Sequence, residues 1–309
     1  MFDVVGLGTV AADIVKRVDK LPAADGFAVI LETTFLPGGS GSNVITQISR
    51  LGGTCAYIAQ VGDDSIGEVV IGSLKDEKVD TSGILIKEKG STIHTEIVVD
   101  QQGEKFILLS LGDSFISMET SGVNYGLLDQ AKVYFTDLLP GGPAIEGLKR
   151  AKEKGLNTVV NMQVNLGTMT GLGVNKETIL AALPYIDVFA PCREGLFDLC
   201  ETQDVVEAKD CIRKSFSNTL LVTLGGKGSV AFDKEDRMIT VAPHPVKVVD
   251  TTGAGDSYLG GFIYKHFIQQ SGLQESMEFA SRCAAFTCGG LGARSCPTLE
   301  DVLSGNEIG

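Results

Sequence analysis

The sequence predicts an α/β fold in which a mostly parallel sheet has helices on both faces and carries a small β lid. The first observation is that extended and helical segments alternate from Lys132 onward, which is typical of parallel strands joined by crossover helices. The second is that glycine-rich turns repeatedly join an extended segment to a helix. The third is a predicted hairpin within residues 92–109, which interrupts the alternation and favours a small separate sheet.

Length and composition restrict the classes of protein to consider. The 309 residues are expected to form one domain, 1–309, with the lid formed by about 14–36 and 91–112. A net charge of −13 argues against a nucleic-acid partner. No apolar run has the length of a membrane span, and no export signal precedes the first strand, so a cytoplasmic protein without a membrane partner is expected. The seven cysteines form no Cys-x-x-Cys pair, which favours reduced thiols over a structural zinc site.

The first expected strand covers residues 2–8 and is apolar enough to be buried on both sides. Gly6 and Gly8 match half of a dinucleotide-binding fingerprint, but the third glycine is missing, so the signal for NAD is weak. Asp13 is expected just beyond the carboxyl end of this strand. There it would accept hydrogen bonds from a polyhydroxylated ligand, or it would simply cap a turn or a helix.

A glycine-rich loop at residues 37–43 separates two kinds of segment. Residues 28–35 are predicted to form one or two short strands, and apolar residues at helical spacing follow from Val44 to Leu51. Asn43 can both donate and accept hydrogen bonds, which suits sugar hydroxyls. The alternative is that Asn43 only caps the helix.

The next elements lead into the lid. Residues 55–61 are predicted to form a strand, a helix extends to about Lys78, and 84–86 form another strand. The hairpin of residues 92–100 and 105–109 would then pair with the early strands to cover a ligand. A lid of this kind would exclude water from the bound ligand. Its open edges would be covered by pairing with a second copy of the chain.

The second half of the chain supplies most of the parallel sheet. The expected strands span residues 133–135, 157–161, 187–190, 219–224 and 229–232, and the expected helices span 143–154, 176–183, 194–200, 204–216 and 276–288. In such sheets ligands bind beyond the carboxyl ends of the strands. The Gly225–Gly228 loop is therefore either a nucleotide contact or only a tight turn to the next strand.

The stretch from Val249 to Ser257 is the strongest local signal. Extended segments are expected at 238–241 and 246–249, and a helix is expected from Ser257 to Gln270. A glycine turn at a helix N-terminus presents backbone N–H groups to an anion, and the helix dipole adds positive charge. Asp256 at the rim would take a proton from a hydroxyl that attacks phosphorus. The alternative is a glycine-rich turn followed by a capping residue.

These motifs together resemble a known family. Gly38-Gly39-Ser40-Gly41-Ser42-Asn43 and the stretch from Asp250 to Asp256 look like the two signatures of the ribokinase-like (PfkB) carbohydrate kinases. Val61–Gly67 and Thr223–Gly228 fit the same family in the same order, and the match extends from the first strand to Pro297. The resemblance implies a ribokinase-like fold and ATP-dependent phosphorylation of a primary hydroxyl on a sugar.

The resemblance also implies roles for individual residues and for Mg²⁺, which would arrive with ATP. Asp256 would be the general base, and the amides of Gly253, Ala254 and Gly255 would form an anion hole. The implied ligand sites are the sugar site at Asp13, Gly39 and Asn43, the nucleotide site at Thr223, Gly225 and Gly228, and a monovalent-cation site, for K⁺, at Asp250 and Thr252.

Three features of the sequence depart from the family pattern. An Asn-x-x-Glu motif linked to magnesium and phosphate handling is expected after residue 190, but Cys192 and Gly195 replace Asn and Glu. Glu194, one residue away, is the remaining candidate for magnesium. Ser40 stands where ribokinases carry Lys, which weakens a ribose assignment. His94, in the first strand of the hairpin, either bonds the substrate or is a histidine on the lid surface.

Two classes of function remain open from the sequence. The first is a sugar kinase, with a nucleoside kinase as its nearest enzyme rival. The second is a non-catalytic sugar or nucleotide sensor on the same scaffold, suggested by the changes at Cys192 and Gly195. Retention of Asp256 within an intact glycine loop favours the enzyme. The family's habit of pairing lids, together with the exposed edges, predicts a homodimer.

Overall fold

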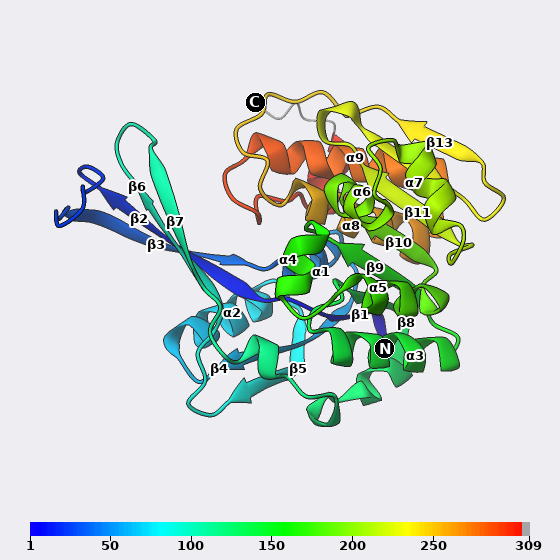
Figure 1. The fold of residues 1–309 in the computed structure, drawn as a ribbon, viewed down its shortest axis with the longest axis horizontal. Helices are drawn as coiled ribbons and strands as arrows, with labels where there is room; N and C mark the ends of the chain where they lie inside the picture. The colour runs from blue at the N-terminus through cyan, green and yellow to red at the C-terminus, as the bar shows by residue number, and fades with distance from the viewer. Residues whose placement is uncertain (305–309) are drawn as a thin grey trace.

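The protein consists of a large sheet flanked by helices and a smaller sheet that projects from it (Figure 1). The structure, a computed structural model, describes residues 1–304. The main sheet has nine strands, in spatial order β13 (Met238–Val241), β12 (Ser229–Phe232), β11 (Thr219–Thr223), β10 (Val188–Pro191), β9 (Asn157–Met162), β8 (Ala131–Thr136), β1 (Phe2–Leu7), β4 (Cys55–Gly62) and β5 (Asp80–Lys87). Strands β12 and β13 are antiparallel and the others pair in parallel.

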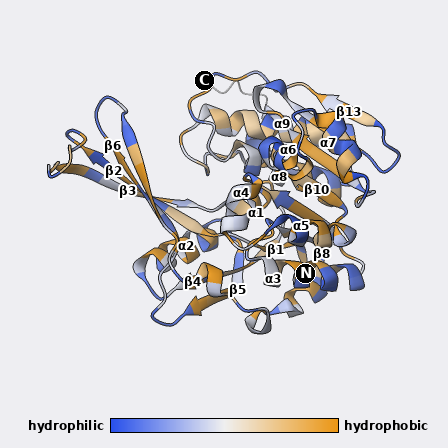
Figure 2. Ribbon diagram, viewed as in Figure 1, coloured by the Kyte–Doolittle hydropathy of each residue, from blue (hydrophilic) through white to orange (hydrophobic). Residues whose placement is uncertain are grey.

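Helices cover both faces of the main sheet. One buried cluster packs the sheet against α1 (Ser40–Arg50), α2 (Ser65–Asp76), α8 (Ala254–Ile263) and α9 (Leu273–Gly289). The other packs it against α3 (Gly141–Glu153), α4 (Leu166–Gly171), α5 (Lys176–Ala182), α6 (Arg193–Cys200) and α7 (Val205–Ile212). Strands buried on both sides are mostly apolar, and Figure 2 shows this hydrophobic colouring along the central strands. A last short helix, α10 (Leu299–Ser304), packs beside α9.

The smaller sheet is the lid. It has four strands in the order β3 (Ile30–Gly38), β2 (Ala11–Val18), β6 (His94–Val99) and β7 (Lys105–Ser110). The central pair, β2 and β6, is parallel, and each edge strand is antiparallel to its neighbour. Figure 1 shows this sheet extending away from the helices, so most of its area is not covered by the main body.

The predicted α/β class, the mostly parallel sheet and the β lid are confirmed, with corrections at three places. Asp13 does not follow a strand end, because it lies inside β2, which runs on almost directly from β1. Residues 246–249 form no strand, since Pro243 and Pro245 remove ladder donors and the segment instead lines a cavity. The predicted helix to Gln270 ends as α-helix at Ile263 and continues as a π-helix at Tyr264–Ile268.

Short helices were the elements that the sequence pattern did not predict. They are α4, α10 and several 3₁₀ turns between residues 115 and 130. No helix among residues 1–304 is both long and apolar enough to cross a membrane.

Candidate active site

The site is built around the start of α8. Gly253 precedes the helix with φ 78°, a conformation that favours glycine. A Cβ at this position would lie 2.6 Å from the Cα of Ala293, so a side chain would not fit either. At Gly255 a Cβ would meet nothing within 4 Å, which leaves backbone open to the cavity. Glycine is therefore required at Gly253 by the turn and leaves room at Gly255 for a ligand.

The N–H groups at this turn have different partners. The N–H of Ala254 donates to the carbonyl of Thr251 at 3.2 Å. Among the described residues, the N–H groups of Gly253 and Gly255 have no backbone acceptor. The predicted anion hole therefore has its two free amides at the two glycines, whereas the amide of Ala254 is used to close the turn.

Asp256 lies in the first turn of α8 and is held by side chains from α1. The hydroxyl of Ser40 donates to Oδ1 of Asp256, and Nδ2 of Asn43 donates to Oδ2 at 2.9 Å. Nδ2 of Asn161 donates to the Ser40 hydroxyl at 3.1 Å. Burial raises the pKa of Asp256 to about 6, although the hydrogen bonds from Ser40 and Asn43 oppose this effect. A carboxylate with this pKa is ionised at neutral pH and is still able to accept a proton.

Asp256 opens onto a cavity of about 260 Å³ at the carboxyl ends of β9, β10 and β11. The residues that line it are Asn161, Gln163, Ala190, Pro191, Cys192, Leu221, Thr223, Gly253, Gly255, Asp256, Tyr258 and Leu259. Asp256 is the one carboxylate in that set, and its other polar side chains are neutral. The cavity therefore combines a single base with amides, hydroxyls and a helix N-terminus.

A second cavity, of about 350 Å³, adjoins the first and shares Thr223, Gly255 and Tyr258 with it. Its other lining residues are Gly225, Gly226, Gly228, Pro243, His244, Val246, Val248, Thr251, Ala254, Ser281, Ala284, Ala285 and Cys288. The predicted nucleotide residues all lie here. The Gly225–Gly228 loop is the turn between β11 and β12, and its contact with a nucleotide stays a prediction. A largely apolar cavity beside a glycine turn at a helix N-terminus is the arrangement that the predicted nucleotide site calls for.

The predicted sugar residues lie at the base of the lid. The hydroxyl of Thr95 donates to Oδ1 of Asp13, its partner across β2 and β6. Gly39 has φ 91°, and a Cβ there would lie 2.7 Å from the Cα of Val10. Asn43 reaches Asp256 directly. Nδ1 of His94 lies 2.9 Å from the carbonyl of Thr92, and His94 is on the opposite face of β6 from Thr95 because neighbouring strand residues alternate.

The predicted cation residues behave differently from one another. Asp250 accepts from the hydroxyl of Thr252 at 2.7 Å and from the N–H of Gly292 at 2.9 Å, which brings two loops together beside the predicted anion hole. Glu194 instead forms an ion pair with Arg193 at 2.7 Å and does not line the cavity of Asp256. Among residues 1–304 no group of three or more His, Cys, Asp or Glu side chains is placed to hold a metal ion.

Several residues of the site were not predicted from the sequence. Asn161 and Gln163 follow the apolar part of β9, and Asp137 follows β8. Polar residues at the carboxyl ends of parallel strands indicate a ligand site, and this was the signal that could have identified them. Ser40 was noted for its departure from ribokinases and not for its contact with Asp256. Arg294 donates from Nε to Oδ1 of Asn43 at 3.3 Å, and no local pattern marks it because its partner is far away in the sequence.

The fold and this arrangement define a carbohydrate kinase, and comparison with known proteins agrees. The family model of the pfkB carbohydrate kinases matches residues 1–300, so the chain belongs to that family. The predicted family and its activity, phosphoryl transfer to the hydroxyl of a sugar, are thereby confirmed.

Individual relatives are similar at a modest level of identity. The chain is 28% identical to fructokinase-1 of Zea mays over 305 residues, covering 93% of this chain and 94% of the relative. It is 29% identical to the ATP-dependent ribose-1-phosphate kinase of Halopiger xanaduensis over 305 residues, covering 98% of each. The solved structure of Arabidopsis thaliana ribokinase, complexed with ribose and ATP, superimposes with a TM-score of 0.82 at 21% identity and covers 98% of each chain. This last likeness establishes the ribokinase fold.

Proposed function

We propose that the protein transfers the γ-phosphoryl group of ATP to a primary hydroxyl of a small sugar, with Asp256 as the general base. The observation that carries this proposal is the position of Asp256, which shares one cavity with the two free glycine amides and with Thr223 of the nucleotide loop. A sensor would need no base at this point. Asp256 would remove the hydroxyl proton while the amides of Gly253 and Gly255 stabilise charge on the transferring phosphoryl group.

ATP would occupy the two adjoining cavities. The apolar residues Val246, Val248 and Ala284 would pack against the base, and Gly225 and Gly228 would allow backbone to approach the sugar and phosphates. Thr223 lines both cavities, so the phosphates would lie between them. The terminal phosphoryl group would then lie over the start of α8.

Mg²⁺ would be bound mainly through the phosphates. The donor set beside Asp256 consists of neutral amides, and these suit the water molecules that Mg²⁺ keeps in nucleotide sites. Asn161 and Gln163 are the residues placed to hold such waters, and Glu194 is not, because it faces Arg193. When bound, the ion would neutralise phosphate charge. A monovalent cation such as K⁺ would lie beside Asp250 and the loop at Gly292.

The sugar would bind between the lid and the start of α1. Oδ2 of Asp13 and the amide of Asn43 supply an acceptor and a donor for sugar hydroxyls. Gly39 is required by the turn between them, because a Cβ there would meet the backbone of Val10. His94 lies on the other face of β6 and is left outside this proposed sugar site.

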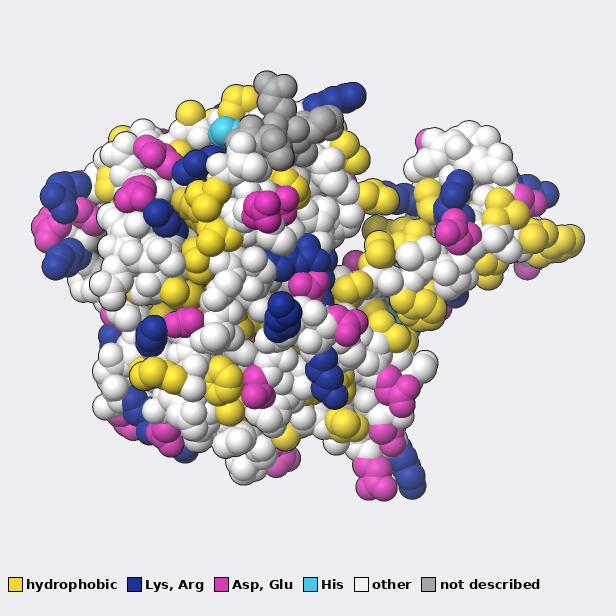
Figure 3. All heavy atoms as spheres, turned by 180° about the vertical axis from the view of Figure 1, so that it is seen from behind, with side chains coloured by type: hydrophobic (Ala, Val, Ile, Leu, Met, Phe, Trp, Pro, Cys, Tyr) yellow, Lys and Arg dark blue, Asp and Glu magenta, His cyan; other side chains and the backbone are white. Residues whose placement is uncertain are grey.

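The lid would also form a homodimer. Its edge strand β7 exposes Phe106, Ile107, Leu108 and Leu109, and β3 exposes Phe35. Figure 3 shows hydrophobic side chains gathered on the projecting lid. Because these exposed apolar residues are consecutive, both faces of β7 are hydrophobic. Closure over a substrate would cover only one face, which leaves the other for a second copy of the chain. The variant Ile107→Glu/Leu108→Glu should sediment as a monomer if a second copy covers the lid, and an unchanged mass would refute this dimer.

The test of the function is a substrate screen that reads ADP release with ATP and Mg²⁺. Fructose, ribose, ribose 1-phosphate and a set of nucleosides are each compared in the native protein and in Asp256→Asn. Turnover with one of the sugars supports the proposal. Turnover with nucleosides alone supports the nucleoside kinase, and tight sugar binding by calorimetry without ADP release supports the sensor.

A further inference from the structure

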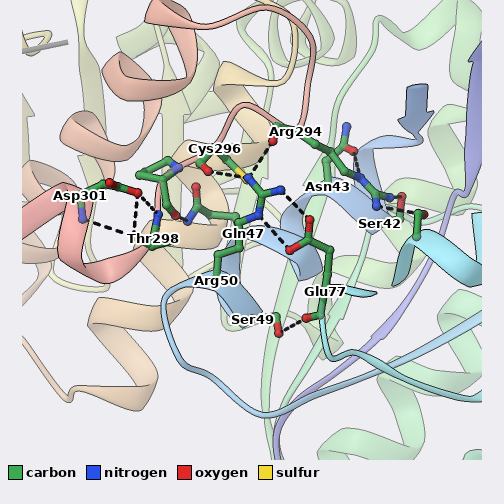
Figure 4. Close-up of polar contacts among 12 residues, drawn as sticks. Ser42, Asn43, Gln47, Ser49, Arg50, Glu77, Arg294, Cys296, Thr298 and Asp301 are labelled. Atoms are coloured by element: carbon green, nitrogen blue, oxygen red, sulfur yellow. Dashed lines mark hydrogen bonds and ion pairs between the residues drawn. The ribbon is translucent and has the colours of Figure 1, made fainter. Parts of the chain in front are cut away.

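Helix α1 presents three polar side chains along one face, at Asn43, Gln47 and Arg50 (Figure 4). Nε2 of Gln47 donates to the carbonyl of Pro297 at 2.9 Å, and its Oε1 accepts from the hydroxyl of Ser257 at 2.6 Å. The face of α1 therefore contacts two regions at once, the segment 294–297 and the catalytic helix α8. Asn43 makes the same kind of double contact one turn earlier.

Arg294 is the partner of Asn43 in that segment. Its guanidinium donates to Oδ1 of Asn43 at 3.3 Å, to the hydroxyl of Ser42 at 3.0 Å and to the hydroxyl of Ser73 at 3.2 Å. Among the described residues no carboxylate lies within ion-pair distance of it. Glu77, the acidic group nearby, is paired instead with Arg50 at 2.5 Å.

The contact from Arg294 decides which way the Asn43 amide faces. An amide has an acceptor end and a donor end, and the guanidinium can meet only the acceptor. With Oδ1 held by Arg294, Nδ2 must point the other way, where it donates to Oδ2 of Asp256 at 2.9 Å. The reversed amide would set an oxygen against the carboxylate and an NH₂ against the guanidinium, so both ends would repel.

We propose that Arg294 is a positioning residue for phosphoryl transfer, which acts through Asn43 to hold the carboxylate of Asp256 toward the reacting hydroxyl. The inference depends on the proposed role of Asp256 as the base. Arg294 lies far from Asn43 in the sequence, so no local pattern indicates this function. The chain of contacts is Arg294 to Asn43 to Asp256, and each link is a single hydrogen bond.

The charges around Asp256 give this proposal a measurable signature. Burial has the largest effect on the pKa of Asp256 and raises it; the charge of Asp137, at the end of β8, raises it further, while the positive charge of Arg294 lowers it. The other groups that contact Asp256, Ser40 and Asn43, are neutral. Arg294 in turn faces Glu77, Arg50, Cys296 and Tyr57, and burial lowers its pKa to about 10, which leaves it charged at neutral pH. Loss of this charge would raise the pKa of Asp256.

The test combines Arg294→Met, Arg294→Lys and a double-mutant cycle with Asn43→Ala. In Arg294→Met we expect kcat to fall by about tenfold or more with an unchanged KM for ATP, and the acid limb of the kcat profile to move to higher pH. Arg294→Lys keeps the charge and should restore the position of that limb. In the Asn43→Ala background, Arg294→Met should lower kcat by less than about twofold, because the intermediary is already lost.

Arg50→Met is the matched control. Arg50 donates to the carbonyls of Arg294 and Cys296, each at 2.7 Å, and so anchors the same segment without contacting Asn43. This variant should lower the unfolding midpoint and leave the acid limb in place. If Arg50→Met moves the limb as far as Arg294→Met, or if the Arg294 and Asn43 effects simply add, Arg294 has only a structural role. Native turnover in Asp256→Asn would instead refute the function on which the inference depends.

Discussion

Two carboxylates, those of Asp137 and Asp256, lie on either side of the first residues of α1. The hydroxyl of Ser40 donates to Asp256, and the N–H of the next residue, Gly41, donates to Asp137 at 3.1 Å. Burial raises the pKa of each carboxyl to about 6. By their acidity alone the two groups cannot be told apart.

Their partners and their access distinguish them. Asp137 is fully buried and accepts from the backbone N–H groups of Thr9, Gly41 and Leu139 as well as from the hydroxyl of Thr9. The bonds to Asp256 come from side chains, and this carboxylate opens onto a cavity. A perturbed pKa therefore marks a candidate, and access to a ligand separates the base from the carboxylate that joins β1, α1 and β8.

Removing the charge of Asp256 should give the largest effect on activity. Asp256→Asn keeps the shape of the side chain and loses the proton acceptor, so we expect turnover to fall by about 10²-fold or more, while sugar and nucleotide binding persist. ADP release and calorimetry measure the two properties. Asp137→Asn is the matched control and should keep most of the turnover. A native rate in Asp256→Asn would show that the carboxylate is not the base.

Truncating Asp137 should give the largest effect on stability. Asp137→Ala leaves the N–H groups of Thr9 and Leu139 without their acceptor in a buried site and leaves the N–H of Gly41 with only the hydroxyl of Thr9, which we expect to cost about 3 kcal/mol of unfolding free energy. Asp256→Ala leaves two side-chain donors that can reach water in the cavity, and should cost less than about 1 kcal/mol. Urea denaturation measures both. If both variants lose the same unfolding free energy, the two carboxylates contribute equally to stability.

The sequence predicted the second half of the fold better than the first. From residue 131 onward each strand is a short apolar run and each long helix has a clear period, because the main sheet buries both faces of its strands. Strand β2 was harder to predict because it follows β1 after a short connection and belongs to the other sheet. Its exchange of sheets depends on pairing with β6, which is distant in the sequence.

The same distinction applies to the site. Asp256, Gly253 and Gly255 could be predicted because one local motif contains the turn, the helix start and the base. Asp137 and Arg294 could not, because their roles depend on contacts with α1 across long stretches of sequence. Local patterns thus predicted the chemistry, and the structure was needed for the residues that orient it.

The pH dependence should report on the two carboxylates through different measurements, because only Asp256 is proposed to act in turnover, whereas both raised pKa values change stability in the same direction. Asp256 must be ionised to accept a proton, so kcat should fall about tenfold per unit as the pH drops below its pKa of about 6. Asp137 has a pKa of about 6 in the folded protein against an ordinary value of 3.8, so the folded state binds its proton more tightly than the unfolded chain does. Its contribution to stability is therefore greatest at low pH and is lost as the pH rises from about 4 to about 6.

Asp137→Asn provides the comparison for both measurements. It should keep the acid limb of kcat, and its unfolding free energy should vary less between pH 4 and pH 6 than that of the native protein. Carboxyl groups whose pKa is lowered by hydrogen bonds within the folded protein change stability mainly below pH 4, and they cancel in the difference between the two proteins. If Asp137→Asn clearly moves the acid limb of kcat, the limb reports on both carboxyl groups together and not on Asp256 alone.

The smallest expected effect comes from one donor to Asp137. Thr9→Val removes the hydroxyl that donates to Oδ2 of Asp137 at 2.6 Å and keeps the size of the side chain. The N–H of Thr9 still donates to the same oxygen at 2.9 Å, and the N–H of Gly41 keeps its bond of 3.1 Å, so the carboxylate stays partnered. We expect a loss of about 1 kcal/mol in unfolding free energy with turnover retained. A fall in turnover without a loss of stability would place Asp137 in the chemistry and remove the distinction between the two carboxylates.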